Sequence, residues 1–193
     1  MSGFFLVLLC FCLLLVIIII GGALFLLSVY NGLKTLNVLV DEAWSGIDVQ
    51  FKKRYDLIPN LVETVKGYAK HESGVFEKVA ELRSGMMNAK SPEELGKVEG
   101  ELRGTLKTLF AVAENYPELK ANENFISLQR NLQQIENDLE SARRYYNGTV
   151  RDLNAKIVVF PNSLIANNFG IKSRQFFEIT VPEERENVKV NFE

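Results

Sequence analysis

The sequence predicts an all-α membrane protein: an N-terminal transmembrane helix, then an elongated up-and-down bundle of three to four helices, and a short β-like C-terminal tail. The first observation behind this is that no charged side chain precedes Lys34, whereas the remaining chain carries 22 basic and 24 acidic residues. The second is that apolar residues then recur at helical spacing as far as Pro161. We expect an anchor, a helical bundle and a tail in residues 1–33, 34–170 and 171–193.

The apolar run from Phe4 to Val29 is longer than the roughly 20 residues that cross a bilayer core. Tyr30 follows it, at a place where an interfacial aromatic side chain often sits. A cleaved signal peptide is the alternative, but no Lys or Arg precedes the run, and the run is too long for the apolar part of a signal. We therefore favour a membrane anchor. Lys34 behind the span places the C-terminal side in the cytoplasm by the positive-inside rule.

The first soluble helix is predicted by apolar residues that share one broad face. They are Leu36, Val40, Ala43, Ile47, Phe51, Ile58, Leu61, Val65, Ala69, Phe76 and Val79. A broad apolar face contacts more than one neighbour, which favours a bundle. Pro59 interrupts the pattern without changing its phase, so we expect a kinked but continuous helix. Gly74 is a second weak point.

The later helices have clearer boundaries. Residues 91–94 (SPEE) have the form of a capping box with proline at the first helical position, and Pro117 ends the helix that follows. Residues 122–160 then carry apolar side chains at alternating steps of three and four, the heptad spacing of a coiled coil. At 1.5 Å per residue this last helix measures on the order of 58 Å, so an elongated domain is expected.

Residues that carry metal or acid–base chemistry are scarce. His71 is the one histidine, and a di-iron bundle needs a Glu-x-x-His pair on each of two helices. Cys10 and Cys12 lie inside the apolar run, and no phosphate-binding loop or hydrolase motif occurs. Near-balanced charge gives no field that would recruit nucleic acid. We therefore predict no enzyme activity, no cofactor, no metal and no nucleic-acid partner.

Polar residues on the apolar face are the candidate site. Four of them fall there: Gln50, Arg54, Glu72 and Arg83. Arg54 projects near the middle of the face, and a buried arginine needs an acidic partner. The candidate partners on other helices include Glu101, Glu136, Asp138 and Asp152. One hypothesis is a proton or ligand site; the other, which we favour, is a polar layer that fixes the register of the helices.

The tail changes periodicity after Pro161. Apolar residues alternate with polar ones in two short runs: Phe177, Ile179 and Val181, then Val188, Val190 and Phe192. A lone two-stranded hairpin is marginal in water, and its edges invite another chain. We therefore predict that tails from neighbouring protomers pair in a homo-oligomer. The alternative is a tail that lies on its own bundle.

Several blocks of the chain resemble the LemA family. They are residues 41–44 (DEAW), 47–50 (IDVQ), 53–62 (KRYDLIPNLV), 65–69 (VKGYA), 116–125 (YPELKANENF), 146–147 (YN) and 160–161 (FP). The resemblance extends over nearly the whole chain, and blocks of this length are specific.

The resemblance implies a single-pass protein of the bacterial inner membrane, with a short N-terminus outside and a helical bundle in the cytoplasm. It also implies no enzyme activity. The expected function is that of a non-enzymatic, membrane-anchored scaffold that self-assembles at the envelope, in membrane stress or organisation. The alternative is an adaptor or partner of a membrane zinc metalloprotease of the heat-shock type. The expected partners are thus the lipid bilayer, further copies of the chain and, in the alternative, that protease.

Overall fold

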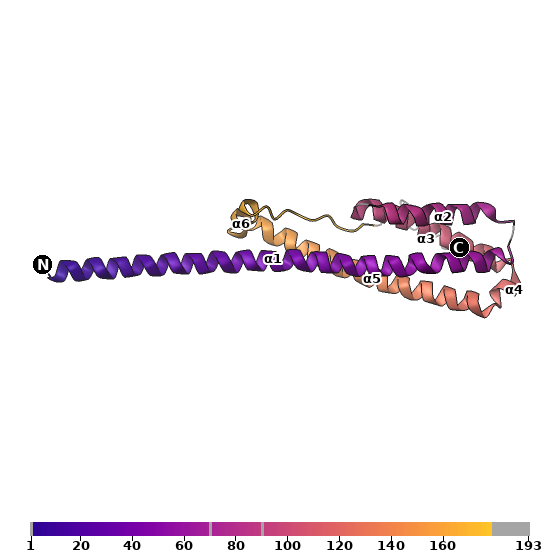
Figure 1. The fold of residues 1–193 in the computed structure, drawn as a ribbon, viewed down its shortest axis with the longest axis horizontal. Coiled ribbons are helices and arrows are strands. Elements are labelled where there is room, and N and C mark those ends of the chain that lie inside the picture. The colour runs from indigo at the N-terminus through magenta and orange to yellow at the C-terminus, as the bar shows by residue number, and fades with distance from the viewer. Residues whose placement is uncertain (1, 70, 90, 179–193) are drawn as a thin grey trace, which may run out of the picture. The chain divides into compact units, whose positions relative to one another are not determined.

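The computed structural model describes residues 2–69, 71–89 and 91–178, and every regular element in them is a helix (Figure 1). The helices are α1 (Ser2–Lys66), α2 (Ser73–Asn88), α3 (Pro92–Glu114), α4 (Pro117–Lys120), α5 (Glu123–Val158) and α6 (Asn162–Asn168). The predicted helical class is therefore correct. No strand occurs in the described residues, and the predicted tail residues from Ile179 to Phe192 lie outside them.

Helix α1 joins the apolar N-terminal run to the first helix of the domain without a break. The anchor boundary expected at residue 33 therefore coincides with no change of element. The most apolar window of α1 has none of its residues buried, whereas the core helix of a soluble protein is mostly buried. Its length and composition are those of a candidate membrane span.

Pro59 lies inside α1, and the helix continues through it as the unchanged apolar phase predicts. Proline has no backbone N–H, so the carbonyl four residues earlier, that of Tyr55, lacks its helical donor. Arg83 of α2 supplies one, because its Nε donates to the Tyr55 oxygen at 3.2 Å. The Arg83 guanidinium also lies 3.7 Å from the centre of the Tyr55 ring. Arg83 therefore stabilises the proline-containing turn.

The break between α1 and α2 comes before the expected weak point at Gly74. Helix α1 ends at Lys66, and the amides of Tyr68 and Ala69 both donate to the Val65 carbonyl to close its last turn. Ala69 is fully buried although it belongs to this turn. Its burial explains why the apolar periodicity of the sequence continues past the end of the helix.

The remaining helix starts follow the sequence signals. Ser91 precedes α3, and its Oγ accepts a hydrogen bond from the Glu94 amide at 3.1 Å, as the capping pattern predicts. Asn122 does the same for α5, with its Oδ1 accepting from the Phe125 amide at 3.1 Å. Pro117 begins the single turn of α4.

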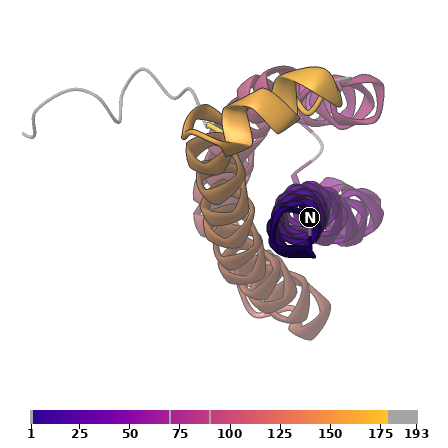
Figure 2. The same cartoon turned by 90° about the vertical axis from the view of Figure 1, so that its left-hand side faces the viewer.

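The chain forms two compact units, and α1 and α5 contribute to both. The first unit holds the residues up to Glu42 together with Thr149–Arg174, and the second holds Ala43–Gly148 with the described residues after Arg174. Within the second unit α2 turns back along α1, and α3 lies beside α2 in both views (Figure 1, Figure 2). Leucine and isoleucine dominate its core: Ile47, Ile58, Leu61, Leu102, Leu109 and Leu139 are each no more than 1% exposed.

Candidate functional site

Arg54 lies in the interior of the second unit with 4% of its surface exposed. One guanidinium nitrogen pairs with Glu99 of α3, and the other donates to Glu136 Oε2 of α5 at 2.8 Å. Arg143 Nη2 lies 3.5 Å from Glu136 Oε1. Arg54, Glu99, Glu136 and Arg143 thus form a buried ion cluster that joins three helices.

Only part of this cluster is predictable from the sequence. Glu136 was among the candidate partners of Arg54, but Glu99 was not. Glu99 lies four residues after Leu95 and three before Leu102, so an acid stands on the apolar stripe of α3. Arg143 has the same relation to Leu139 and Tyr146 on α5. A charged residue at such a position was the signal that could have identified both.

The other candidate partners of Arg54 make contacts of their own. Glu101 lies 3.6 Å from Lys78 Nζ, Asp138 accepts from Gln134 at 3.0 Å, and Asp152 lies 3.2 Å from Arg151.

The other predicted polar-layer residues have separate places. Gln50 is half-buried, and its Oε1 is one of four buried polar atoms without a hydrogen-bond partner within the described chain. Glu72 is the residue before α2, and its side chain makes no capping hydrogen bond. Arg83 belongs to the proline-containing turn of α1.

The remaining unpartnered atoms belong to the ion cluster itself: Arg54 Nε, Arg143 Nη1 and Glu99 Oε2. A buried polar atom without a partner costs about 1–3 kcal/mol, so these three atoms offset part of the stability that the ion pairs contribute. Slipping any helix by a turn would separate the opposite charges and leave more such atoms behind.

Burial dominates the electrostatics of the cluster. Desolvation raises the pKa of Glu99, with the nearby Arg54 opposing that shift and Glu136 adding to it. Desolvation likewise lowers the pKa of Arg143, while Glu136 and Glu99 act in the opposite sense. Both shifts favour the neutral form, because a charge removed from water loses its hydration.

The Glu99 shift predicts a pH dependence of stability. In the unfolded chain Glu99 titrates near its ordinary value of 4.5, and in the folded chain it titrates higher. Between those values only the folded state holds the proton, so this stabilisation is complete below the unfolded pKa and is lost as pH rises through the folded pKa. Glutamine cannot titrate. We therefore expect the Tm of the wild type, relative to that of Glu99→Gln, to fall as pH is raised.

Circular dichroism melts of both full-length proteins in detergent, at a series of pH values, measure this difference. Glu93→Gln, which removes an exposed carboxylate of the same helix, is the control and is expected to show no comparable trend. A constant difference would mean that folding leaves the pKa of Glu99 unchanged, and a difference that grows in favour of the wild type would mean that folding lowers it.

A second cluster holds the segment after α6. Phe177 is 3% exposed, and its ring lies 6.3 Å from that of Trp44 and 6.0 Å from that of Phe51. The Tyr146 ring completes the group at 5.3 Å from Trp44, and the Tyr146 hydroxyl donates to the Gln175 carbonyl at 2.8 Å. Phe177, predicted to face a neighbouring protomer, is thus buried within its own chain.

Asn147 of α5 fixes the backbone of Phe177. Its Oδ1 accepts from the Phe177 amide at 2.8 Å, and its Nδ2 donates to the Phe177 carbonyl at 2.9 Å. This pair of bonds imitates the pairing between two strands, and it satisfies an extended segment that has no sheet to join. No local sequence pattern predicts this contact, because the partners are 30 residues apart.

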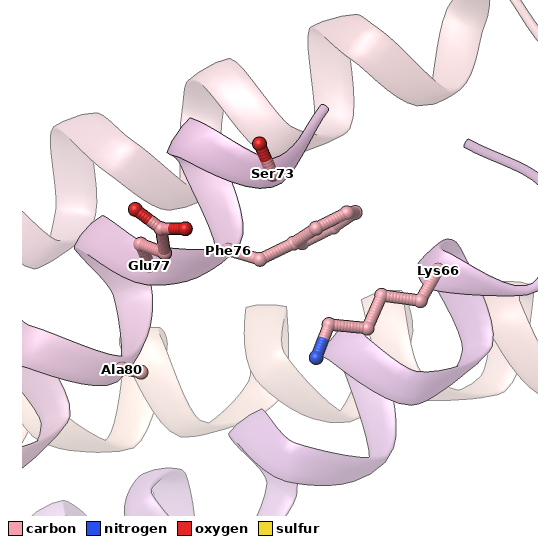
Figure 3. A pocket seen from close by; sticks show the side chains of 5 residues that line it. All are labelled: Lys66, Ser73, Phe76, Glu77 and Ala80. Atoms are coloured by element: carbon pink, nitrogen blue, oxygen red, sulfur yellow. The ribbon is translucent and has the colours of Figure 1, made fainter. Parts of the chain in front are cut away.

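A shallow cavity of about 410 Å³ lies where α1 turns into α2. It is lined by Lys66, Ser73, Phe76, Glu77 and Ala80, and Figure 3 shows the side chains of Lys66 and Phe76 facing each other. The Lys66 ammonium lies 5.7 Å from the centre of the Phe76 ring. In the part of the chain that the structure describes, no group of three or more His, Cys, Asp or Glu residues has metal-binding geometry.

The family model of the LemA family matches residues 43–192, which include both clusters. The chain belongs to the LemA family. Protein LemA of Metamycoplasma hominis is 26% identical over 72% of this chain and 64% of its own length. Magnetosome protein MamQ 2 of Paramagnetospirillum magneticum is 24% identical over 79% of this chain and 66% of its own length. The matched part is therefore under two thirds of each relative.

The sequence blocks that resemble the LemA family include residues of both clusters. Arg54 lies in one block, Trp44 in another, and Tyr146 with Asn147 in a third. Together with the exposed apolar helix, family membership indicates a membrane-associated protein.

Proposed function

We propose that this LemA family member is a non-enzymatic scaffold, anchored in the bacterial inner membrane, that self-assembles and organises the envelope. The observation that supports this best is α1, which carries the exposed apolar segment and the first helix of the domain as one element. An anchor joined to its domain without a linker keeps that domain next to the bilayer. Such a connection suits a protein that positions other components.

The pairing inside the second unit also supports a structural role. The charged groups of the ion cluster are paired with one another, and Arg83 and Asn147 satisfy backbone atoms of their own chain. A proton or ligand site would direct such groups towards an opening. We therefore favour a register-fixing polar layer over a ligand site.

Self-assembly is proposed from the alternating apolar residues after Phe177, which follow the spacing of strands. We expect a chain truncated after Glu178 to lose the homo-oligomer of the full-length protein, because the truncation removes these residues and keeps the fixed Phe177. Native mass spectrometry of the detergent-extracted proteins measures both masses. A variant with Lys189 and Lys172 changed to glutamine is a control that keeps the apolar residues.

Two results would contradict self-assembly through the tail. One is a truncated chain that keeps the full-length oligomer. The other is a full-length chain that is recovered as a monomer bound at fixed ratio to a second protein. A membrane metalloprotease as that second protein would favour the adaptor role instead.

The proposed topology, with the bundle in the cytoplasm, is testable by thiol labelling. Ser141 is exposed on α5 and lies in the second unit, so a cysteine there is accessible. In a background with Cys10 and Cys12 changed to alanine, we expect Ser141→Cys to resist a membrane-impermeant thiol reagent in intact cells and to react after permeabilisation. Labelling of Ser141→Cys in intact cells would show that the bundle lies outside the cytoplasm.

A further inference from the structure

Exposed apolar side chains gather where α5 ends and α6 follows. Five of them are 57–75% exposed: Val158, Val159, Phe160, Leu164 and Phe169. Other apolar residues of the same segment, among them Ile165 and Ala166, are buried. The segment is therefore amphipathic: one face is already used for folding, and the other presents large apolar side chains to the surroundings.

This segment adjoins the end of the apolar N-terminal run. The Phe169 ring lies 4.6 Å from the ring of Tyr30, the residue that closes the run. Lys156 Nζ comes within 3.8 Å of the position that a Cβ on Gly32 would take. Both contacts lie inside the first unit, where α6 lies near α1 (Figure 1). The exposed apolar face is thus continuous with a helix whose apolar side chains are themselves exposed.

Charge around the segment follows the pattern of a membrane surface. No charged residue occurs between Lys156 and Lys172, and both lysines are exposed. Lys34 is exposed as well, with its Nζ 5.9 Å from the centre of the Tyr30 ring. Basic side chains beside an apolar surface are attracted to anionic lipid headgroups.

We propose that residues 157–171 dock on the bilayer surface at the end of the span, with Val158, Phe160, Leu164 and Phe169 in the boundary between headgroups and acyl chains. Interfacial helices typically bury their apolar face about 5–10 Å into this region. The contact between Phe169 and Tyr30 sets the depth, because Tyr30 marks the end of the span. This inference rests on the proposed membrane anchorage but not on self-assembly.

The occupant of this face is lipid and not a second copy, because the face continues the lipid-facing surface of α1. A protein partner would have to share the space that the bilayer around the span occupies. Docking gives the chain a second attachment to the membrane beside the span.

Fluorescence quenching by spin-labelled lipid tests this docking. The full chain, with Cys10 and Cys12 changed to alanine, is reconstituted in nanodiscs of phosphatidylethanolamine and phosphatidylglycerol. Single cysteines at Leu164, at Ile17 in the span and at Ser141 on α5 carry an environment-sensitive fluorophore. We expect lipids with a nitroxide at the top of the acyl chain to quench Leu164→Cys several-fold more than Ser141→Cys.

The three labelled sites distinguish anchorage by the span from docking of residues 157–171. If Ile17→Cys is quenched by lipids with a nitroxide deep in the acyl chain, but Leu164→Cys is quenched no more than Ser141→Cys, the docking inference is overturned and the anchor stands. If Ile17→Cys is not quenched, the anchorage fails and this inference fails with it. A blue-shifted Leu164→Cys that lipid nitroxides do not quench would place a protein partner on this face, which also overturns the inference.

Discussion

Replacing Arg54 by alanine is expected to lower the free energy of unfolding by about 3–5 kcal/mol, because the change leaves a buried acidic partner without its cation. Glu99 has no exposed surface, and its pairing with Arg54 is the main attraction that opposes its desolvation. Chemical denaturation followed by circular dichroism, on the full chain in detergent, measures the loss. A midpoint close to that of the wild type would show that Arg54 lies at the surface.

Arg144→Ala is the matched control for Arg54→Ala. Arg144 also lies on a helix and pairs with an acid, Glu140 at 3.2 Å, but its side chain is 71% exposed. An exposed pair of this spacing contributes about 0.3–0.5 kcal/mol. We expect Arg54→Ala to lose several times more free energy of unfolding than Arg144→Ala, because the two arginines differ mainly in burial.

A double replacement shows whether the loss of stability in Arg54→Ala comes from the unpaired charge or from lost side-chain packing. Changing Arg54 to methionine and Glu99 to leucine together removes both buried charges, and Glu136 keeps Arg143 as a partner. Replacing a buried ion pair by apolar residues of similar volume is often neutral or stabilising, by about 1–4 kcal/mol. We therefore expect the double variant to be more stable than Arg54→Ala. Equal loss in both would assign the effect to packing.

Replacing Phe177 by alanine is expected to lower the free energy of unfolding by about 3–5 kcal/mol. This is the range for a phenylalanine buried in a core. The segment around Phe177 has no sheet partner, so its attachment depends on this ring and on the bonds to Asn147. Trp44 is the one tryptophan of the chain and lies 6.3 Å from the Phe177 ring. We expect its emission to shift to the red as the segment is released.

Phe176→Ala provides the comparison, because Phe176 is the neighbouring residue and is 43% exposed. Its loss is expected to change Trp44 emission and stability little. Red-shifted emission from both variants would show that removing either aromatic residue loosens the segment. An unchanged spectrum in Phe177→Ala would show that Asn147 and Tyr146 hold the backbone without the ring.

Several features of the fold follow from short stretches of sequence. The uncharged run to Val29, the cap at Ser91 and the start of α5 after Asn122 each depend on residues within a few positions, so local rules predict them. The continuation of α1 through Pro59 was predictable from its unchanged phase. The break after Lys66 was not, because Ala69 is buried from a turn and continues the helical pattern.

The composition of the ion cluster was only half predictable. The helical phase of Arg54 shows that it faces the interior, but phase on one helix does not say which residue of another helix comes opposite. Glu99 and Glu136 are separated from Arg54 by 45 and 82 positions. Their pairing depends on the register of three helices, which is a property of the assembled unit.

By itself, the sequence determined that this chain has an exposed apolar N-terminal helix, a helical domain behind it, and Arg54 on an apolar face, because hydrophobic periodicity and capping act over one or two turns. The tertiary structure alone decided that Glu99 and Arg143 join Arg54, that Arg83 satisfies the carbonyl freed by Pro59, and that Asn147 fixes Phe177. These contacts join residues far apart in the chain. Each buried polar group must find a partner once water is removed, and only the folded unit determines which partners are within reach.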